Sequence, residues 1–316
     1  MTEQRITEAA PDQIEAVAAL CGRAFTDQGA EFFLTSMRED PRAEEAVTLV
    51  SWVGEEMASS VRVYTREIRW RGGTVTLGCI GNVATDPAHR GKGLAGALMR
   101  HSIEVMQSRG HSLSLLFTDI PQMYAKFGYE GFDQPWWSVD SARIRPIGKG
   151  LRVRDAQWPR DGDAIQRLQA GFNEGHDGTL VRDAAQWRSM HCVFPTDDVI
   201  SLVAERTGEI VAHARVLQKG AVAPRLHEVS ATDAEAAAAV IAEAIRRSRA
   251  LGDGQVSVTL PGWPLIREGI GAACEGWSVA PRFAGMWRGL EGGIAHGEIM
   301  ERARAGELYF WAGDRF

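Results

Sequence analysis

Hydrophobic and polar positions change their period several times along the first half of the chain, and these changes predict its elements. Residues 6–25 predict a short strand followed by a helix, in which the apolar residues have helical spacing. Apolar residues also predict helices over residues 43–52 and 94–106. Alternating apolar residues predict strands over residues 57–71 and 74–85, joined by a glycine turn. The first hundred residues therefore mix helices with antiparallel-looking strands.

The next forty residues complete one unit of this pattern. Residues 112–117 predict a strand, residues 122–127 predict a short helix, and residues 128–132 turn back into extended chain. One strand–helix–strand crossover among antiparallel-looking strands indicates an α/β fold with a mixed sheet.

The second half repeats the first at a constant offset. Ile6-Thr-Glu-Ala matches Val153-Arg-Asp-Ala, and Ala84-Thr-Asp matches Ala231-Thr-Asp, each pair 147 residues apart. Phe25 and Phe172 share the same offset. A shared offset together with a shared order of elements indicates a structural duplication.

The duplication predicts two tandem domains and a tail. The glycine- and proline-containing stretch 144–150 has little periodicity and marks the boundary. We expect a first domain over residues 1–145, a second over residues 151–290 and a C-terminal tail over residues 291–316. The tail ends in the aromatic run Tyr309-Phe-Trp-Ala-Gly-Asp-Arg-Phe316, which predicts that it docks toward the first domain.

Composition narrows the class of protein. The 316 residues are 45% hydrophobic and 24% charged, as in a globular protein, and no apolar run approaches the 18 residues of a membrane span. The first residues lack the order of a signal peptide, so we expect a cytoplasmic location. A net charge of −6 without a basic cluster disfavours nucleic acid and favours a cationic partner. The four cysteines are scattered, which predicts neither a metal site nor a disulfide framework.

Candidate chemistry lies where a predicted strand, a basic glycine loop and a helix start follow one another. His89, Arg90 and Lys92 stand at the start of a helix, where positive charge is unfavourable unless an anion lies between them. Gly91 and Gly93 leave the backbone N–H groups accessible to such an anion. The loop therefore predicts a phosphate or pyrophosphate site, with a solvated basic turn as the alternative.

Two common phosphate motifs fit this loop poorly. A Walker loop needs a Ser or Thr after Gly-Lys, and here Gly93 follows Lys92. Gly91, Gly93 and Gly96 match the spacing of a Rossmann fingerprint, but the stretch about 20 residues on is Ser-Leu-Ser, with no acidic residue for a ribose. Dinucleotide binding is thus weakly supported.

The motifs resemble those of the GNAT acetyltransferase superfamily. The hexad Arg90-x-x-Gly93-x-Ala95 follows Val83-Ala-Thr, and Tyr124-Ala-Lys-Phe-Gly-Tyr129 comes later at the spacing of the family's catalytic segment. The second half lacks the hexad and a tyrosine near Leu260-Pro-Gly. The whole is similar to tandem acetyltransferases of the enhanced-intracellular-survival type without their sterol-carrier-like third domain, so the second unit is expected to be degenerate.

The resemblance implies a binding site for acetyl-CoA and no metal. The backbone of three strand residues would bond the pantetheine arm, and the loop and helix start would hold the pyrophosphate. The strand residues are Val83, Ala84 and Thr85, and the loop residues are Arg90, Gly91, Lys92, Gly93, Leu94, Ala95 and Gly96. Tyr124 would be the general acid, because a phenol of pKa ~10 can protonate a thiolate leaving group of pKa ~8.5. The alternative for Tyr124 is a packing aromatic.

The acceptor is expected to be an amine that attacks the thioester directly. Tandem relatives of this type use a C-terminal carboxylate as the base, which here would be that of Phe316; simple packing of the tail is the alternative. Asp27 and Glu31 are candidates to bind a cationic acceptor, or else ordinary surface carboxylates. A polyamine-like or aminoglycoside-like molecule or a peptide amine fits this reading. The competing hypotheses are a non-catalytic acyl-CoA-binding or sensing protein and a nucleotide-binding module.

Overall fold

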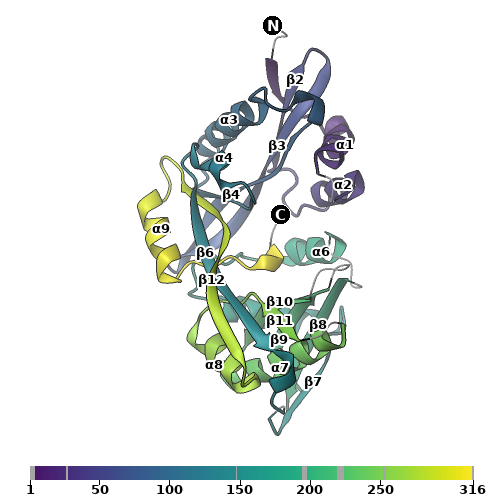
Figure 1. Cartoon of the computed structure of the whole chain (residues 1–316), viewed down its shortest axis with the longest axis vertical. Helices are drawn as coiled ribbons and strands as arrows, with labels where there is room; N and C mark the ends of the chain where they lie inside the picture. Colours follow the sequence, from purple (N-terminus) through teal and green to yellow (C-terminus); the bar gives the residue numbers. More distant parts are fainter. Residues whose placement is uncertain are drawn as a thin grey trace.

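The computed structural model describes residues 4–25, 28–146, 148–193, 198–218, 224–251 and 254–314, which fold around one continuous mixed sheet. Its strands lie in the order β1-β2-β3-β4-β5-β12-β6-β11-β10-β9-β8-β7 (Figure 1). The strands are β1 (Gln4–Glu8), β2 (Val47–Val53), β3 (Glu56–Trp70), β4 (Gly73–Thr85), β5 (Leu113–Leu116), β6 (Glu130–Asp140), β7 (Leu151–Asp155), β8 (Val199–Arg206), β9 (Glu209–Leu217), β10 (Arg225–Ala231), β11 (Gln255–Val258) and β12 (Trp277–Gly289). The helices are α1 (Ile14–Ala24), α2 (Ala30–Arg38), α3 (Leu94–Ser108), α4 (Pro121–Ala125), α5 (Gly162–Phe172), α6 (Ala184–Val193), α7 (Ala234–Leu251), α8 (Pro264–Ala273) and α9 (His296–Ala305).

The first half is an antiparallel meander followed by one crossover. Strands β1 to β4 pair antiparallel in sequence order, and α3 carries the chain to β5, which pairs parallel to β4. The predicted strands of the β3–β4 hairpin and the predicted crossover helix are confirmed. The mixed α/β fold class is confirmed with them.

The helix predicted over residues 43–52 is wrong. The second helix is α2, which ends at Arg38, while residues 41–45 form turns and β2 begins at Val47. Val47 and Leu49 are buried on one face of β2 and Val50 on the other. A strand buried on both faces loses the alternation that identifies strands, so its apolar run resembles a helix.

Helices cover both faces of the first half. On one face, Val61 and Val63 of β3 pack with Leu98 of α3. On the other face, Ala84 of β4 packs with Val17 of α1 in a cluster that also includes residues of α2. Figure 1 shows α3 and α4 on one side of β3 and β4, and α1 and α2 on the other. The carboxyl end of β4 is thus enclosed between two helical layers.

The two halves exchange strands in the middle of the sheet. β12 inserts between β5 and β6, pairing antiparallel with both, and β6 in turn pairs with β11 (Figure 1). β1 and β7 begin 147 residues apart, as do β6 and β12, so the offset read from the sequence recurs in the fold. The sheet is therefore continuous across the boundary predicted at residues 144–150.

The second half repeats the layers of the first, and the last segment lies along it. α7 and α8 pack on one face of β8 to β11, while α5 and α6 pack with Val203 on the other. After α9, the chain passes through a buried aromatic segment, Leu308–Trp311. Tyr309 donates to the carbonyl of Thr259 at 3.0 Å, and Trp311 Nε1 donates to Asn173 Oδ1 at 2.8 Å. The described chain ends in a short 3-10 helix, Ala312–Asp314, near α6 (Figure 1).

Candidate functional site

The site begins where β4 and β5 separate. The two strands pair from Leu77 with Leu113 to Ile80 with Leu116, and β5 ends there while β4 continues to Thr85. Just beyond the last pair, Asn82 has a positive φ of 51°, within the bulge that shifts the register between β4 and β3. The bulge redirects the end of β4, and backbone groups on its β5 side have no strand partner there among the described residues.

The backbone of this strand end points alternately toward β3 and toward the opening. The carbonyl of Ala84 accepts the Ser59 hydroxyl at 2.6 Å, and the Asp86 N–H donates to Ala58 O at 2.9 Å. Because successive residues of an extended strand direct their backbone groups to opposite sides, those of Val83 and Thr85 face away from β3. Of the three residues expected to bond a pantetheine arm, these two therefore face the opening.

The loop after β4 leads into α3 with an exposed backbone. Gly91 and Gly93 both have φ of 78°, a left-handed conformation that side chains disfavour, and no described atom lies within 4 Å of where their Cβ would be. Gly93 is the N-cap of α3, whose first turn, Leu94-Ala-Gly-Ala, carries no acidic residue. The unpaired N–H groups of this helix start are therefore accessible to an anion.

Hydrogen bonds of the Asp86 side chain hold the start of this loop in place. The Asp86 carboxylate accepts from the Ala88 N–H at 3.0 Å and from Arg23 Nε at 2.9 Å. The hydrogen bond from Arg23 is the main cause that holds the pKa of Asp86 below its ordinary value. Further along, Leu94 is buried at the helix start, and Gly96 faces Phe127, whose ring would be in ordinary contact with an added Cβ at 3.7 Å.

The three basic residues of the loop differ in their surroundings. His89 is buried, with Nε2 at 2.9 Å from Glu56 Oε2 and Nδ1 at 3.0 Å from Lys92 Nζ. Arg90 is exposed and donates to Ala24 O at 3.0 Å. The buried His89 ring thus positions the Lys92 ammonium group by a hydrogen bond, while Arg90 and Lys92 remain at the surface beside the glycines.

Tyr124 lies on α4, in the apolar cluster next to the last paired residues of β4 and β5. It is buried in the same apolar cluster as Ile80 and Leu116, the last residues that pair β4 with β5. Burial raises the pKa of Tyr124 to about 12, an effect only partly offset by a hydrogen bond with Thr118. The phenol is therefore protonated throughout the neutral range and available as a donor.

A cavity of about 520 Å³ lies between the two halves and reaches the same strand ends. The first half contributes aromatic residues around α2, side chains of β3, and the carboxyl ends of β4 and β5; the second half contributes α6, β8, β9 and β10. From the first half the lining residues are Phe25, Gln28, Phe32, Phe33, Ser36, Tyr64, Arg66, Ile80, Gly81, Asn82 and Phe117. From the second half they are Gln186, Ser189, Met190, Val199, Arg215, Leu217, Arg225 and His227, with Ala312 and Gly313 of the final segment.

The acceptor residues expected from the sequence stand in different positions. Glu31 is exposed in the first turn of α2 and is not among the described residues that line the cavity. Asp27 and Phe316 lie outside the described residues. Gln28 and Gly313, their near neighbours in sequence, line the cavity.

Sequence reasoning missed the arginines of the cavity. Arg66 lies on β3, Arg215 on β9 and Arg225 at the start of β10, and none belongs to a local motif. Arg66 and Arg215 are nonetheless among the most buried arginines, at 5% and 4% exposed. A charged residue at an inward position of an apolar strand was the available signal, because buried charges usually have a specific reason.

Buried ion pairs fix the final segment beside the cavity. Arg182 donates to Asp314 Oδ1 at 2.7 Å and to Glu228 Oε1 at 2.6 Å, and Arg215 Nη1 lies 3.5 Å from Glu228 Oε2. The side chains of Arg182, Asp314 and Glu228 are at most 1% exposed. Gly313 packs on His227, since an added Cβ would lie 3.0 Å from the ring. This segment is therefore a fixed part of the cavity wall.

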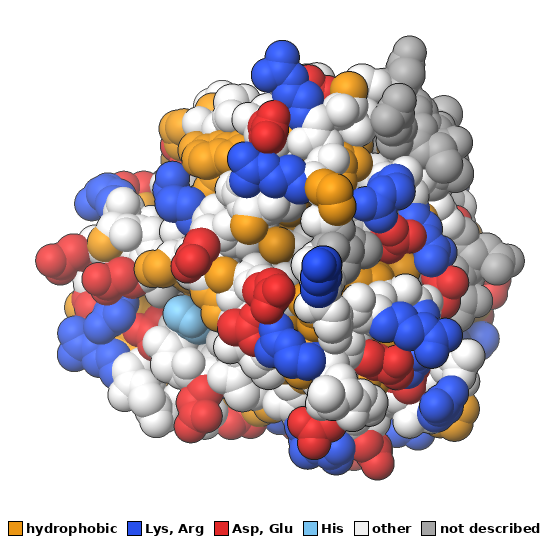
Figure 2. Space-filling view, turned by 90° about the horizontal axis from the view of Figure 1, so that it is seen from below, with side chains coloured by type: hydrophobic (Ala, Val, Ile, Leu, Met, Phe, Trp, Pro, Cys, Tyr) orange, Lys and Arg blue, Asp and Glu red, His pale blue; other side chains and the backbone are white. Residues whose placement is uncertain are grey.

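Three observations on the described part of the chain concern other kinds of site. Within it, no group of three His, Cys, Asp or Glu side chains is placed to hold a metal ion. None of the helices described combines the length and apolar character needed to cross a membrane. On the face of the second half shown in Figure 2, basic and acidic side chains are interspersed, unlike the basic surface of a nucleic-acid-binding protein.

Comparison with known proteins identifies the domain that carries this site. Residues 5–132 match the family model of the GNAT acetyltransferase domain. A protein of Streptomyces avermitilis named "Uncharacterized N-acetyltransferase" is 27% identical over 176 residues. The match covers 52% of this chain and 43% of that protein, so it spans less than half of the relative's length.

Solved structures show the same arrangement of two units. Eis1 of Mycobacterium abscessus has a TM-score of 0.64 at 17% identity, over 91% of this chain and 73% of that chain. A tandem GNAT protein from the clavulanic acid biosynthesis pathway has a TM-score of 0.54 at 13% identity, over 93% of this chain and all of that chain. The resemblance read from the hexad is confirmed, and the fold is that of tandem GNAT proteins.

Proposed function

We propose that the protein transfers an acetyl group from acetyl-CoA to an amine that binds in the cavity between its halves. The observation that carries this proposal is that one cavity reaches the ends of both β4 and β5, through Asn82 and Phe117, where the strands separate. Donor groups on one side of the separation and a cavity on the other suit a reaction between two molecules that are held next to each other.

The donor would bind along β4 and the start of α3. Val83 and Thr85 offer backbone groups to the pantetheine arm, and the N–H groups from Gly91 to Gly96 suit the pyrophosphate. Arg90 and Lys92 add positive charge beside these glycines. The open space at both positive-φ glycines supports this assignment, because a side chain there would block the approach of an anion.

The chemistry uses one proton donor and one proton acceptor. The amine nitrogen attacks the thioester carbonyl carbon, the C–S bond breaks, and Tyr124 supplies a proton to the leaving sulfur. The proton that the nitrogen then loses as it becomes an amide restores the phenol. An amine of pKa ~10 is mostly protonated at pH 7 and must first lose a proton. We assign that step to the carboxylate of Phe316, a proposal supported by Gly313, three residues earlier, which lines the cavity.

The first test is a calorimetric titration of acetyl-CoA and CoA into the wild-type protein and two variants. Gly93→Glu places a carboxylate at the proposed pyrophosphate site and should abolish micromolar binding. Gly72→Glu is the matched control, because Gly72 also has a positive φ and open surroundings but lies in the β3–β4 turn, at the opposite end of β4. Wild-type protein that binds neither ligand while folded would contradict the proposal.

Turnover distinguishes an enzyme from a binding protein. Release of CoA thiol is measured with a panel of amines under saturating acetyl-CoA. Binding without thioester cleavage for every amine would favour a non-catalytic acyl-CoA-binding protein. Preferential binding of ATP or NAD would favour a nucleotide-binding module.

A further inference from the structure

We propose that the acceptor carries an anionic group, a carboxylate or phosphate, which Arg215 and Arg225 hold at the wall of the cavity formed by the second half. This inference rests on the proposed function and names the class of its substrate. It differs from the cationic acceptor that the net charge of the chain favours. The evidence is the distribution of charge around the cavity.

The charged residues that line the cavity share one sign. Arg66 comes from the first half, and Arg215 and Arg225 come from the second. None of the described lining residues is acidic. His227, the remaining titratable base, is buried among these arginines, and burial lowers its pKa to about 3, so it is neutral and leaves the cationic character to the guanidinium groups.

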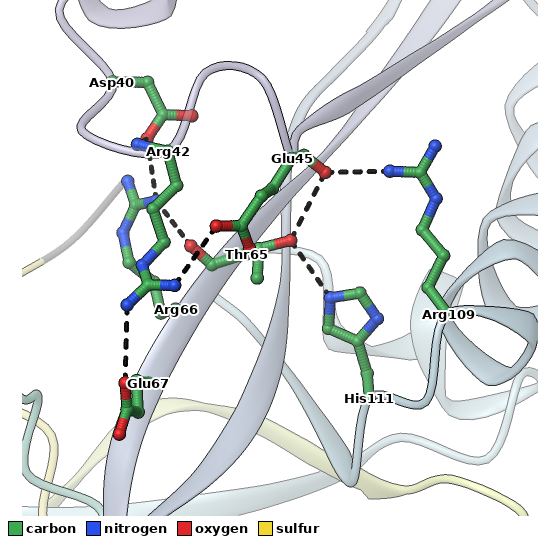
Figure 3. Close-up of polar contacts among 8 residues, drawn as sticks. All are labelled: Asp40, Arg42, Glu45, Thr65, Arg66, Glu67, Arg109 and His111. Atoms are coloured by element: carbon green, nitrogen blue, oxygen red, sulfur yellow. Dashed lines mark hydrogen bonds and ion pairs between the residues drawn. The ribbon is translucent and has the colours of Figure 1, made fainter.

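Carboxylates behind the cavity balance only part of this charge. Asp40, in the loop after α2, accepts from Arg66 Nη1 at 2.7 Å and also lies 3.5 Å from Arg62 Nη2. One fully buried carboxylate thus serves two guanidinium groups, and Arg66 Nε has no hydrogen-bond partner among the described residues. Figure 3 shows Asp40 of the loop next to Arg66, and two further contacts between the loop and β3, from Arg42 to Glu67 and from Thr65 to the carbonyl of Glu45.

The arginines of the second half are also incompletely matched. Arg215 Nη1 lies 3.5 Å from Glu228 but makes no hydrogen bond within the described part of the chain. Glu228 is already engaged by both Nη1 and Nη2 of Arg182, at 2.6 and 3.1 Å. A buried guanidinium N–H group without an acceptor destabilises the folded protein, and an anion in the cavity would supply the missing acceptor.

Among the three arginines that line the cavity, Arg225 has the fewest contacts with charged groups of opposite sign. Its guanidinium lies 5.1 Å from the centre of the Trp136 ring, and it forms no ion pair with any residue that the structure describes. Burial lowers its pKa, and the neighbouring Arg282 contributes to this shift. An anionic ligand would relieve both effects, because it compensates the desolvated charge and screens the repulsion between the two arginines.

The lining residues distinguish two parts of the cavity. Asn82 and Phe117 line it where β4 and β5 separate, whereas Arg215 of β9 and Arg225 of β10 line the wall formed by the second half. Apolar Phe33, Ile80 and Phe117 also line the cavity. The occupant is therefore an amine with an apolar body and a distal anion, the chemistry of an ω-amino acid, a short peptide with a free carboxylate, or an aminoalkyl phosphate.

Three probes of similar length isolate the anion. Acetylation of 6-aminohexanoate, hexylamine and 1,6-diaminohexane is followed by CoA release, and 3-aminopropylphosphonate tests a phosphate-like group in place of the carboxylate. We expect kcat/KM for 6-aminohexanoate to exceed that for the diamine by about tenfold or more, since charge-assisted hydrogen bonds typically confer such factors. Equal rates for the three amines, or a preference for the diamine, would overturn the proposal.

Variants of the two arginines on Trp136 provide the matched comparison. Arg225→Gln should lower kcat/KM for 6-aminohexanoate about tenfold and leave hexylamine within about twofold, with Arg225→Lys retaining part of the preference. Arg282→Gln is the control, because Arg282 lies 3.9 Å from the same ring but does not line the cavity. Equal effects of the Arg225→Gln and Arg282→Gln substitutions would contradict an anion site at Arg225.

Measuring amine binding without acetyl-CoA tests the anion site independently of the proposed acetyl transfer. 6-Aminohexanoate and hexylamine are titrated into the protein without acetyl-CoA and detected by calorimetry. If no amine is acetylated, the proposed transfer fails, yet tighter binding of 6-aminohexanoate that Arg225→Gln abolishes would still support the anion site. If amines are acetylated but the carboxylate neither tightens binding nor raises kcat/KM, only the anion site fails.

Discussion

Arg182 and Asp314 meet at 2.7 Å with both side chains fully withdrawn from solvent, and so join the segment before α6 to the last described turn of the chain. Glu228 of β10 completes the cluster by accepting two hydrogen bonds from the same guanidinium. Three segments far apart in sequence are thus held by one buried arginine, next to the part of the cavity wall formed by Gly313.

Removal of this guanidinium should destabilise the protein strongly. Arg182→Met leaves Asp314 without its ion-pair partner and Glu228 with fewer, and a broken buried pair typically costs about 3–5 kcal/mol. Urea unfolding followed by tryptophan fluorescence measures the change. Arg206→Met is the control, because Arg206 pairs with Asp233 and Glu235 at the surface, where the loss should stay below about 1 kcal/mol. A similar small loss for both variants would show that the buried cluster contributes little.

The phenol of Tyr124 should matter for turnover and little for donor binding. Tyr124→Phe keeps the ring in its apolar cluster but removes the proton donor, so kcat should fall about 100-fold while the Kd for acetyl-CoA changes by less than about twofold. Steady-state kinetics and calorimetry test the two parts.

A second buried tyrosine provides the control for that variant. The Tyr129 hydroxyl is hydrogen-bonded to Ser114 Oγ at 2.8 Å, on β5, so Tyr129→Phe removes a buried hydroxyl from the same cluster. It should reduce stability by about 1 kcal/mol and leave kcat nearly unchanged. Equal losses of kcat in the two variants would argue against a specific role for Tyr124 as the acid.

Stability should fall in weakly acidic solution because of a buried histidine. Burial lowers the pKa of His213 to about 4, against about 6.5 in an unfolded chain. Between these values the unfolded state binds the proton and the folded state does not, so stability is complete above pH ~6.5 and declines as the pH falls toward 4.

Urea unfolding at several pH values measures this decline. The contribution of His213 has a limiting slope of about 1.4 kcal/mol per pH unit. His213→Gln should remove that contribution; its neighbour Ser201 lies 3.0 Å from the ring Nε2, and an amide can replace this hydrogen bond. His101→Gln, at an exposed position of α3, is the control and should leave the slope unchanged. An unaltered slope in His213→Gln would disprove the assignment.

The parts of the fold and site that were predictable from sequence are those set by local patterns. The alternation of β3 and β4, the crossover helix α3, and the glycines at positions 91 and 93 each depend on neighbours within a few residues. β2 was not predicted as a strand, because burial on both of its faces removes the alternation of apolar and polar residues. The strand exchange of β6 and β12 depends on pairing across more than 110 residues, for which no local signal exists.

The cavity shows the same limit at the level of the site. The hexad and Tyr124 lie within one continuous stretch and are recognisable as motifs. Arg66, Arg215 and Arg225 line one cavity only because β12 and β6 join the two halves into one sheet, and their spacing along the chain carries no pattern. The overall net charge carries no information about this local arrangement of charges.

The interleaved centre of the sheet also sets the order in which the protein can be completed during synthesis. β5 belongs to the half made first, yet the strand that covers its outer edge, β12, ends at Gly289. At about 5–20 residues per second, a ribosome needs roughly ten to thirty seconds to make the intervening chain. During synthesis, β5 therefore keeps an open edge for this time, until β12 has been made.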